Sequence, residues 1–354
     1  MTESLISSIR REIQARGPIS FARFMELALY HPDAGYYARD GAIRNTGRSG
    51  DFFTNVSVGP LFGRLLAHCF AAWWEKLGKP QPFHVVEFGG LNGRLAQDIL
   101  SALGNDHPAC RRLTEYVLVE PLPRLLQEQQ DALRGQPGVR WVRGAKELRD
   151  IRGVIFGNEL LDSLPVHRVG GGMEYHVSLE AERLAWTRQP CPPVLRRLLP
   201  VKFRGIAEAS PAALDWVRQV SQVLQQGWIL LLDYGWTDEE YFQVERPHGT
   251  LRGYRAHRAV EDVLAEPGEQ DITAHVRWTP FMEEAAAAGL RTEEFIQQGR
   301  WLGRILVEAK LKLDPFGMRQ FNTLTHPDMM GAPFRVLVLG KGQGAPGLEA
   351  KHSP

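Results

Sequence analysis

The feature that most constrains this chain is an alternation, from residue 83 onward, of short apolar runs with segments of helical pattern. The apolar runs are HVVEFG, YVLVE, VRWVRG, GVIFGNE and WILLLDYG, and the segments between them include RLAQDILSAL and AALDWVRQVSQVLQQG. Near-continuous apolar strands separated by helices are typical of a parallel sheet that is covered on both faces. Right-handed crossovers then give a doubly wound α/β sheet, which binds ligands outside the carboxyl ends of its strands.

The remaining segments suggest how the chain is organised around this sheet. Residues 1–80 are predicted to be mainly helical and to pack on an α/β domain that spans residues 81–343. Two insertions interrupt the alternation, an antiparallel one at about 165–205 and a Gly-, Arg- and His-rich one at about 236–275. The run PFRVLVLGKGQG predicts a last strand, and the tail 344–354 is expected to be disordered.

Composition excludes several classes of protein. The 354 residues carry a net charge of +1, so no basic excess favours a nucleic acid, and three scattered cysteines suit a reducing compartment. No apolar run of about 18 residues predicts a membrane span. The start lacks the apolar core of a signal peptide, so we expect a cytoplasmic protein. No metal site is expected, because the His and acidic residues lack compact ligand spacing. The aromatic residues of segment 61–76 fit either a core or a homodimer surface.

The glycine turn after the first apolar run, VVEFGGLNGRLAQDIL, suggests a cofactor site. A strand that passes through glycines into a helix directs backbone N–H groups at a ligand. A nucleotide-triphosphate loop would end in GK[ST], which is absent, and a dinucleotide fingerprint counted from Gly89 fails at Leu91 and Arg94. S-adenosylmethionine (SAM) remains, with Glu120 at the end of YVLVE accepting the ribose hydroxyls. The alternative is a tight turn without a ligand.

These motifs resemble the MidA family of SAM-dependent methyltransferases, whose mitochondrial members are complex I assembly factors. The resemblance covers nearly the whole chain and rests on ISFARFMELALYHPDAGYY, GDFFTN with PLFG, VEFGGLNGRLAQDIL, NELLDSLPVHR, DYG, GTLRGYRAHR, GEQDITAHV and HPDMMGAPFRVLVLGKG. It implies a seven-stranded sheet whose last strand runs antiparallel to the rest. It also implies SAM as cofactor and a protein arginine as the methyl acceptor.

Three positions depart from the family pattern. The usual E-x-G-P-G-x-G turn reads here with Gly90 for proline and Leu91 for the middle glycine. A leucine at a position with positive φ would be strained by about 1–2 kcal/mol, and a shifted turn that uses Gly90 would relieve this strain. Asn55 stands where the family has a small residue, and Arg277 stands where it has Asp or Asn.

The resemblance and the strand ends together nominate the site residues. A guanidinium is always protonated, so its methylation requires carboxylates that align it and take up a proton. We expect Glu159 to orient the acceptor nitrogen, Asn158 to bind through its amide, and Asp162 to serve as a second carboxylate if a helix begins there; Asp162 could equally cap that helix. His275 is a candidate for the acceptor pocket, although such a residue more often packs. The expected cofactor residues are Glu87, Gly89, Gly90, Gly93, Glu120, Asp51 and Asn158.

Other functions remain open at this stage. Leu91 favours a methyltransferase-like assembly factor or binding module whose turn is damaged. A methyltransferase that acts on RNA or on a small molecule is a further alternative, and the near-neutral charge weighs against RNA. A nicotinamide-dependent oxidoreductase is disfavoured because the glycine spacing fails.

Overall fold

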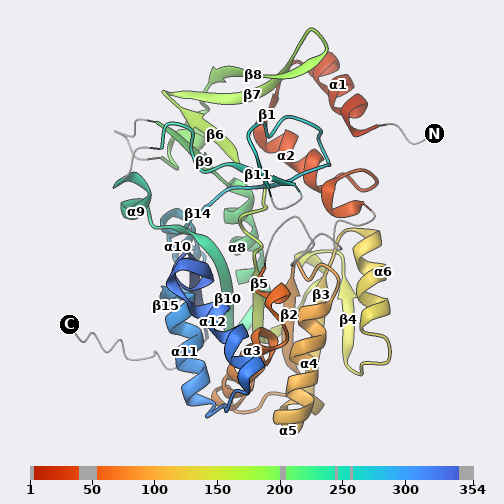
Figure 1. Ribbon diagram of the computed structural model, residues 1–354, viewed down its shortest axis with the longest axis vertical. Coiled ribbons are helices and arrows are strands. Elements are labelled where there is room, and N and C mark those ends of the chain that lie inside the picture. Colours follow the sequence, from red (N-terminus) through yellow and green to blue (C-terminus); the bar gives the residue numbers. More distant parts are fainter. Residues whose placement is uncertain (1–3, 40–53, 200–204, 244–245, 256–257, 343–354) are drawn as a thin grey trace. The chain divides into compact units, whose positions relative to one another are not determined.

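The protein is described by a computed structural model that covers residues 4–39, 54–199, 205–243, 246–255 and 258–342 (Figure 1). Asp51 and the tail 344–354 lie outside the described residues. The chain divides into two compact units. The first comprises residues 1–53, 161–215 and 236–281, and the second comprises residues 54–160, 216–235 and 282–354.

The second unit contains the doubly wound sheet. Its strands are ordered β15-β16-β10-β5-β2-β3-β4. Their bounds are β2 Phe83–Phe88, β3 Thr114–Val119, β4 Val139–Val142, β5 Ile151–Asn158, β10 Leu224–Trp236, β15 Arg291–Gln297 and β16 Phe334–Lys341. The strands β4, β3, β2, β5 and β10 run parallel, whereas β16 runs antiparallel to both of its neighbours. The predicted seven-stranded sheet with an antiparallel last strand is therefore confirmed.

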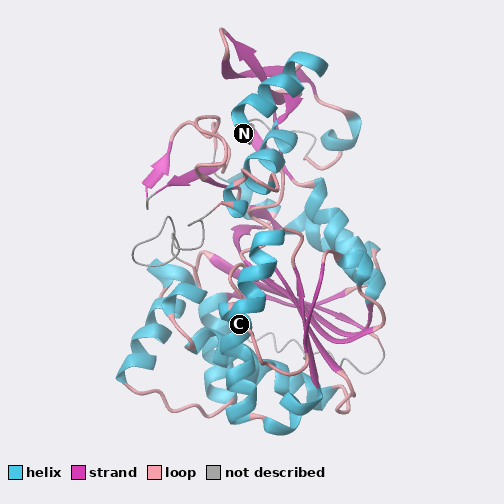
Figure 2. Ribbon diagram, turned by 90° about the vertical axis from the view of Figure 1, so that its right-hand side faces the viewer, coloured by secondary structure: helices cyan, strands magenta, loops and turns pink. Residues whose placement is uncertain are grey.

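Helices cover both faces of this sheet (Figure 2). The helices of the second unit are α3 Leu61–Lys76, α4 Arg94–Asp106, α5 Pro108–Leu113, α6 Pro123–Ala132, α11 Gln298–Glu308 and α12 Pro315–Thr325. Phe62, Leu66 and Phe70 of α3 share one apolar core with Tyr116 and Phe156 of the sheet. Burial of each such side chain contributes about 1.5–3 kcal/mol. This packing places α3 with the sheet, in the unit whose first segment is residues 54–160.

The first unit is built from two small antiparallel sheets and several helices. One sheet has the order β1-β7-β6-β9 with β8 paired to β7, and the other has the order β12-β11-β13. The strands of these two sheets are β1 Ile19–Ser20, β6 His167–Gly170, β7 Met173–Glu180, β8 Arg183–Pro190, β9 Ile206–Ala209, β11 Arg252–Arg255, β12 Arg258–Val260 and β13 Asp271–Thr273. The short strand β14 Val276–Arg277 belongs to neither sheet. The antiparallel strands predicted within 165–205 are thus present as β6, β7 and β8.

The helices of the first unit are α1 Leu5–Arg16, α2 Phe21–Tyr30, α7 Pro193–Arg196 and α9 Asp238–Gln243, while α8 Pro211–Val223 and α10 Trp278–Ala287 contribute residues to both units. Serine side chains set where α1 and α2 begin: Ser4 accepts from the N–H of Ser7, and Ser20 accepts from the N–H of Arg23. The apolar faces of these helices, including Ile9, Phe21 and Phe24, form the core of this unit with Val177 and Ile272.

Candidate active site

The strand register brings the predicted polar residues of the second unit to one edge of the sheet. Phe88 at the end of β2 pairs with Val119 of β3 and with Gly157 of β5. The residues that follow these positions, Gly89, Glu120 and Asn158, therefore leave the sheet at the same level. On the other side of β5, Leu232 of β10 pairs with Asn158, which places Asp233 beside Glu159.

The glycine turn between β2 and α4 has left-handed backbone at three positions. Gly89 has φ 73°, Leu91 has φ 42° and Gly93 has φ 77°, and Gly93 is the N-cap of α4. The first and last positions hold glycine, which adopts this conformation without strain. Leu91 adopts it with a side chain, at a strain of about 1–2 kcal/mol. Gly90 does not have positive φ, so the shifted turn that would relieve Leu91 is not formed.

Glu87 lies beneath this turn and is almost completely buried. A Cβ placed on Gly90 would come within 3.2 Å of the Glu87 carboxyl carbon, so the turn packs directly against this side chain. The hydroxyl of Tyr116 donates a hydrogen bond of 2.7 Å to Glu87 Oε2. Burial raises the pKa of Glu87 to about 7, against the opposing effect of the Tyr116 hydrogen bond.

Glu120 is the second buried carboxyl group at this edge, with 3% of its surface exposed. Its Oε1 accepts from the N–H of Leu122 at 2.9 Å and its Oε2 accepts from Gln129 Nε2 at 3.0 Å. Burial raises the pKa of Glu120 to about 7 although these two hydrogen bonds lower it. Gln129 Nε2 also donates to the carbonyl oxygen of Leu91 at 2.9 Å, so one amide joins the glycine turn to Glu120. No pattern in the sequence indicated Gln129, which lies in the polar helix α6.

Asn158 and Glu159 end β5 and contact one another through their side chains. Asn158 Nδ2 donates to Glu159 Oε1 at 3.0 Å, and the backbone N–H of Asn55 donates to the same oxygen at 3.0 Å. Glu159 has φ 51°, and its backbone N–H donates to the carbonyl oxygen of Leu232 at 2.9 Å. A glutamate with left-handed backbone is strained, and such strain is common at functional sites. The structure thus brings these two predicted residues together.

Asp162 belongs to the other unit, and its local structure differs from the one expected. Residues 161–164 form a turn closed by a hydrogen bond from Leu164 N–H to the carbonyl oxygen of Leu161, so no helix begins at Asp162. Pro165 explains this, because proline lacks an N–H and disfavours helical backbone at the residue before it. Asp162 is 5% exposed, and its carbonyl oxygen accepts from the N–H of Ala274. Its role as a second carboxylate stays a prediction.

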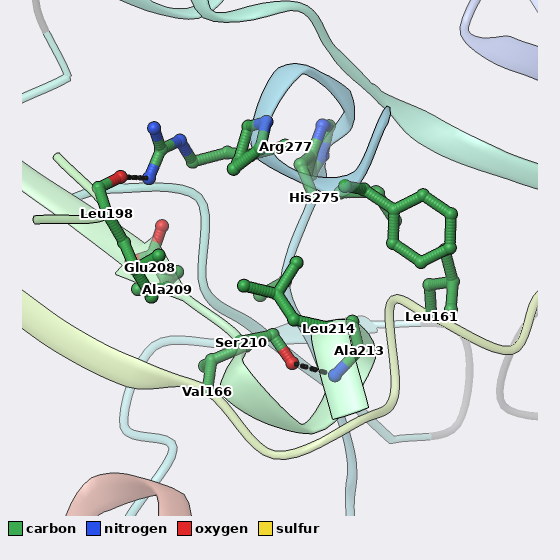
Figure 3. A pocket seen from close by; sticks show the side chains of 14 residues that line it. Leu161, Val166, Leu198, Glu208, Ala209, Ser210, Ala213, Leu214, His275 and Arg277 are labelled. Carbon is green, nitrogen blue, oxygen red and sulfur yellow. Dashed lines mark hydrogen bonds between the residues drawn. The ribbon is translucent and has the colours of Figure 1, made fainter. Parts of the chain in front are cut away.

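His275 lies in the same unit as Asp162, at a small cavity (Figure 3). The imidazole stacks on Trp236 with ring centroids 4.2 Å apart. Burial, followed by the charges of Arg252 and Arg246, lowers the pKa of His275 to about 4. The ring is therefore neutral near pH 7. The cavity of about 40 Å³ has room for a few water molecules and is too small for a nucleoside. These features suit packing better than catalysis, and a catalytic role for His275 stays a prediction.

Arg277 follows His275 by two residues and has its charge neutralised within the first unit. Its Nη2 and Nε donate to the two carboxylate oxygens of Asp238 at 2.6 and 3.0 Å, and its Nη1 donates to the carbonyl oxygen of Leu198 at 2.8 Å (Figure 3). Arg277 as a whole residue is 7% exposed. A bidentate ion pair of this kind holds a charge in place.

In the part of the chain that the structure describes, no helix is long and apolar enough to cross a membrane. No group of three or more His, Cys, Asp or Glu side chains in those ranges has a geometry that could hold a metal ion.

A doubly wound sheet with an antiparallel last strand, a glycine turn after β2 and a buried carboxyl group after β3 defines the class of SAM-dependent methyltransferases. The chain belongs to the family described as "Putative S-adenosyl-L-methionine-dependent methyltransferase", whose model matches residues 65–296. The expected resemblance to a family of SAM-dependent methyltransferases is confirmed, and SAM is the cofactor of this family.

Relatives match nearly the whole chain. "Protein arginine methyltransferase NDUFAF7 homolog, mitochondrial" from Drosophila melanogaster is 28% identical, over 99% of this chain and 86% of the relative. The mouse protein of the corresponding name is 26% identical, over 95% of this chain and 84% of its own length. The structure is similar to a crystal structure of a Burkholderia thailandensis protein bound to S-adenosyl-homocysteine, with a TM-score of 0.84, 30% identity and coverage of 95% and 92% of the two chains.

The comparisons overturn one expectation from the sequence. We expected a cytoplasmic protein because the first residues lack a targeting pattern. The curated relatives from fly, mouse and human are all named as mitochondrial proteins, so the cytoplasmic location is contradicted. The start of the chain was an unsafe guide to location.

Proposed function

We propose that this methyltransferase transfers methyl groups from SAM to an arginine side chain of a protein, and that Glu159 and Asn158 form the acceptor side of its site. The observation that carries the proposal is Glu159, one strand away from the glycine turn, whose backbone is strained and whose carboxylate Oε1 accepts two hydrogen bonds. The names of the relatives, which call them protein arginine methyltransferases, support the choice of acceptor.

The residues at the strand ends fit SAM as a ligand. Glu120 is a buried carboxyl group whose pKa is raised to about 7, and the described structure pairs it with amide donors rather than with a cation. Two ribose hydroxyls would donate to it and stabilise its ionised form. Gly89 and Gly93 have left-handed backbone. Because glycine has no side chain, a ligand can approach the backbone of the turn at these two positions. We propose that Glu87, Gly90 and Asn158 complete this cofactor site; Asp51, which lies outside the described residues, is a further candidate.

The chemistry follows from the properties of a guanidinium. When bound, SAM would supply the methyl group from its positively charged sulfur, and breaking that S–C bond would leave S-adenosylhomocysteine as the second product. The Glu159 carboxylate accepts N–H hydrogen bonds from the planar guanidinium and so aligns the acceptor nitrogen. It then takes up the proton that this nitrogen loses as the new N–C bond forms. Most of the rate enhancement comes from holding the acceptor in line.

The test uses the purified protein with [methyl-³H]SAM and a protein extract from the source cells, followed by hydrolysis and separation of the amino acids. The unmutated protein is expected to place label in methylated arginine. Glu159→Gln keeps the size of the side chain and removes the proton acceptor, so transfer is expected to fall by about 10²- to 10⁴-fold. Glu283→Gln, on an exposed carboxylate of α10, is the matched control and is expected to keep full activity.

Two outcomes would contradict the proposal. Full transfer by Glu159→Gln would remove the role assigned to this carboxylate. Label that appears in nucleic acid or in small molecules, and not in protein, would mean that the acceptor is not an arginine side chain.

A further inference from the structure

Two buried amide side chains of the second unit, Asn55 and Gln298, face each other across 243 residues of sequence. Asn55 Nδ2 donates to Gln298 Oε1 at 3.0 Å, and Gln298 Nε2 donates to Asn55 Oδ1 at 2.8 Å. Both residues are 0% exposed. Gln298 is the first residue of α11, and Asn55 precedes the short 3-10 helix Val56–Val58.

All of the amide hydrogens of this pair have acceptors. Gln298 Nε2 donates its second hydrogen to the carbonyl oxygen of Leu324 at 3.1 Å, at the end of α12. Asn55 Nδ2 donates its second hydrogen to Asn158 Oδ1 at 2.8 Å. Rotating either amide by half a turn would place oxygen against oxygen and nitrogen against nitrogen. The direction of each hydrogen bond in the chain from Leu324 to Asn158 is therefore fixed.

The fixed direction of these hydrogen bonds determines which side-chain atom of Asn158 faces Glu159. Because Asn158 Oδ1 accepts from Asn55, its Nδ2 is directed at Glu159 Oε1, where it donates at 3.0 Å. The backbone N–H of Asn55 donates to the same oxygen. Two donors on one carboxylate oxygen hold the Glu159 side chain in one orientation. No hydrogen bond in the described structure joins Gln298 to Asn158 or Glu159, so it acts on them through Asn55.

We propose that Asn55 and Gln298 are positioning residues, which set the orientation of Asn158 and Glu159 for methyl transfer. This inference rests on the proposed function, because it assigns a purpose only if Glu159 and Asn158 face the acceptor. Packing alone does not require polar groups here, since a pair of apolar side chains of the same shape can replace a buried hydrogen-bonded pair with little loss of stability. Apolar side chains could not orient Asn158.

The test compares Gln298→Met with Gln320→Met. Gln320 is also a buried glutamine of this unit, 4% exposed, and its Oε1 accepts from the N–H of Leu61 at 3.0 Å, which is not part of the hydrogen-bonded chain from Leu324 to Asn158. Both variants lose a buried amide, so both are expected to unfold at a lower temperature. Initial rates of methyl transfer are measured with [methyl-³H]SAM and the same protein extract, and S-adenosylhomocysteine binding is measured by calorimetry.

Gln298→Met is expected to lower kcat by about 10- to 100-fold, because a small displacement of an aligned group has effects of this size. Its KM for SAM and its affinity for S-adenosylhomocysteine should stay within about threefold of the unmutated values, and Gln320→Met should keep its kcat. Asn55→Asp, which is nearly isosteric and removes the donor to Asn158, should also lower kcat. The kcat of Asn55→Asp provides an independent test if Gln298→Met does not fold.

Three results would overturn the inference. The first is an unchanged kcat in Asn55→Asp and in any folded Gln298→Met, which would leave the proposed function standing. The second is an equal loss of kcat in Gln320→Met, which would mean that general destabilisation is the cause. The third is a loss of S-adenosylhomocysteine affinity as large as the loss of kcat. Failure of the unmutated protein to methylate arginine would instead contradict the proposed function.

Discussion

At the scale of single residues, the site combines strained backbone with buried carboxyl groups. Leu91 and Glu159 both have left-handed backbone without being glycine, and Glu87 and Glu120 are both buried with raised pKa values. Each feature lowers stability where it occurs. Their gathering at the carboxyl edge of one sheet is what a ligand site is expected to show.

Glu87 makes the stability of the protein depend on pH. Burial raises its pKa from the ordinary 4.5 to about 7 in the folded protein, so its contribution to stability is present below pH 4.5 and is lost as the pH rises through 7. Glu87→Gln removes the charge and keeps an acceptor for Tyr116. Relative to the unmutated protein, it should gain about 1–3 kcal/mol of unfolding free energy between pH 5 and pH 8. Urea unfolding at the two pH values measures this gain, with exposed Glu283→Gln as the control; a gain that does not depend on pH would contradict the burial of a titrating carboxyl group.

Glu120 should make cofactor binding depend on pH in a related way. Ribose hydroxyls donate to the ionised carboxylate, whereas the protein without ligand holds a proton on Glu120 below about pH 7. The affinity for S-adenosylhomocysteine should therefore be about tenfold weaker at pH 6 than at pH 8. Calorimetry on the unmutated protein and on Glu120→Gln measures this, and the variant should lose the pH dependence. Equal affinity of the unmutated protein at pH 6 and pH 8 would argue against Glu120 as the ribose acceptor.

At the scale of elements, α3 and α4 approach one another very closely. A Cβ placed on Gly63 of α3 would lie 2.5 Å from the Cβ of Asp98 and 3.2 Å from the carbonyl carbon of that residue in α4. Real Cβ atoms do not approach another side chain this closely, so the helices could not remain in place around an alanine. Since α4 begins at Gly93, their packing also holds the last residue of the glycine turn.

Gly63→Ala is expected to lower the free energy of unfolding by about 1–3 kcal/mol, because overpacking forces the two helices apart. Gly104→Ala in α4 is the matched control, since nothing lies within 4 Å of its added Cβ. Alanine is the better helix former, so this control should gain about 0.5–1 kcal/mol. Urea unfolding of both variants measures the difference, and two variants that are equally stable would contradict the close packing of α3 and α4.

The elements also show what a sequence pattern can and cannot predict. Glu87, Glu120, Asn158 and Glu159 could be found because each follows a near-continuous apolar run, which marks a strand end in a parallel sheet. The edge strand β15, RTEEFIQ, has no such run, because its residues are half-buried or exposed. The sequence left open whether a helix begins at Asp162, and the structure has a turn there because Pro165 disfavours helical backbone at the residue before it.

The sequence pattern could not predict the residues that contact the site residues. Gln129, Tyr116 and Gln298 contact the site only because the sheet and helices bring distant segments together. The sequence around each of them gives no signal, because nothing there distinguishes a glutamine or tyrosine that contacts the site from one that does not. Asn55 was the exception, because it departs from the residue type that the family resemblance implies at its position.

At the scale of the whole molecule, the central question is whether this copy of the fold still binds its cofactor. The family, the sheet and the buried Glu120 favour binding. Leu91 opposes it, because its strained backbone is what suggested an inactive assembly factor. The hydrogen bond from Gln129 to the carbonyl oxygen of Leu91 supports the turn in its left-handed form, so we expect the site to be functional.

Calorimetric titration of the purified protein with SAM and with S-adenosylhomocysteine, repeated on Leu91→Gly, tests this claim most directly. The account predicts micromolar binding by the unmutated protein and a similar affinity of Leu91→Gly, because Leu91 is already strained before the ligand binds and relief of that strain raises stability rather than affinity. Binding by Leu91→Gly alone would mean that the turn is disabled and that the protein acts as a methyltransferase-like assembly factor. Binding by neither protein would contradict the account of the glycine turn as a SAM site.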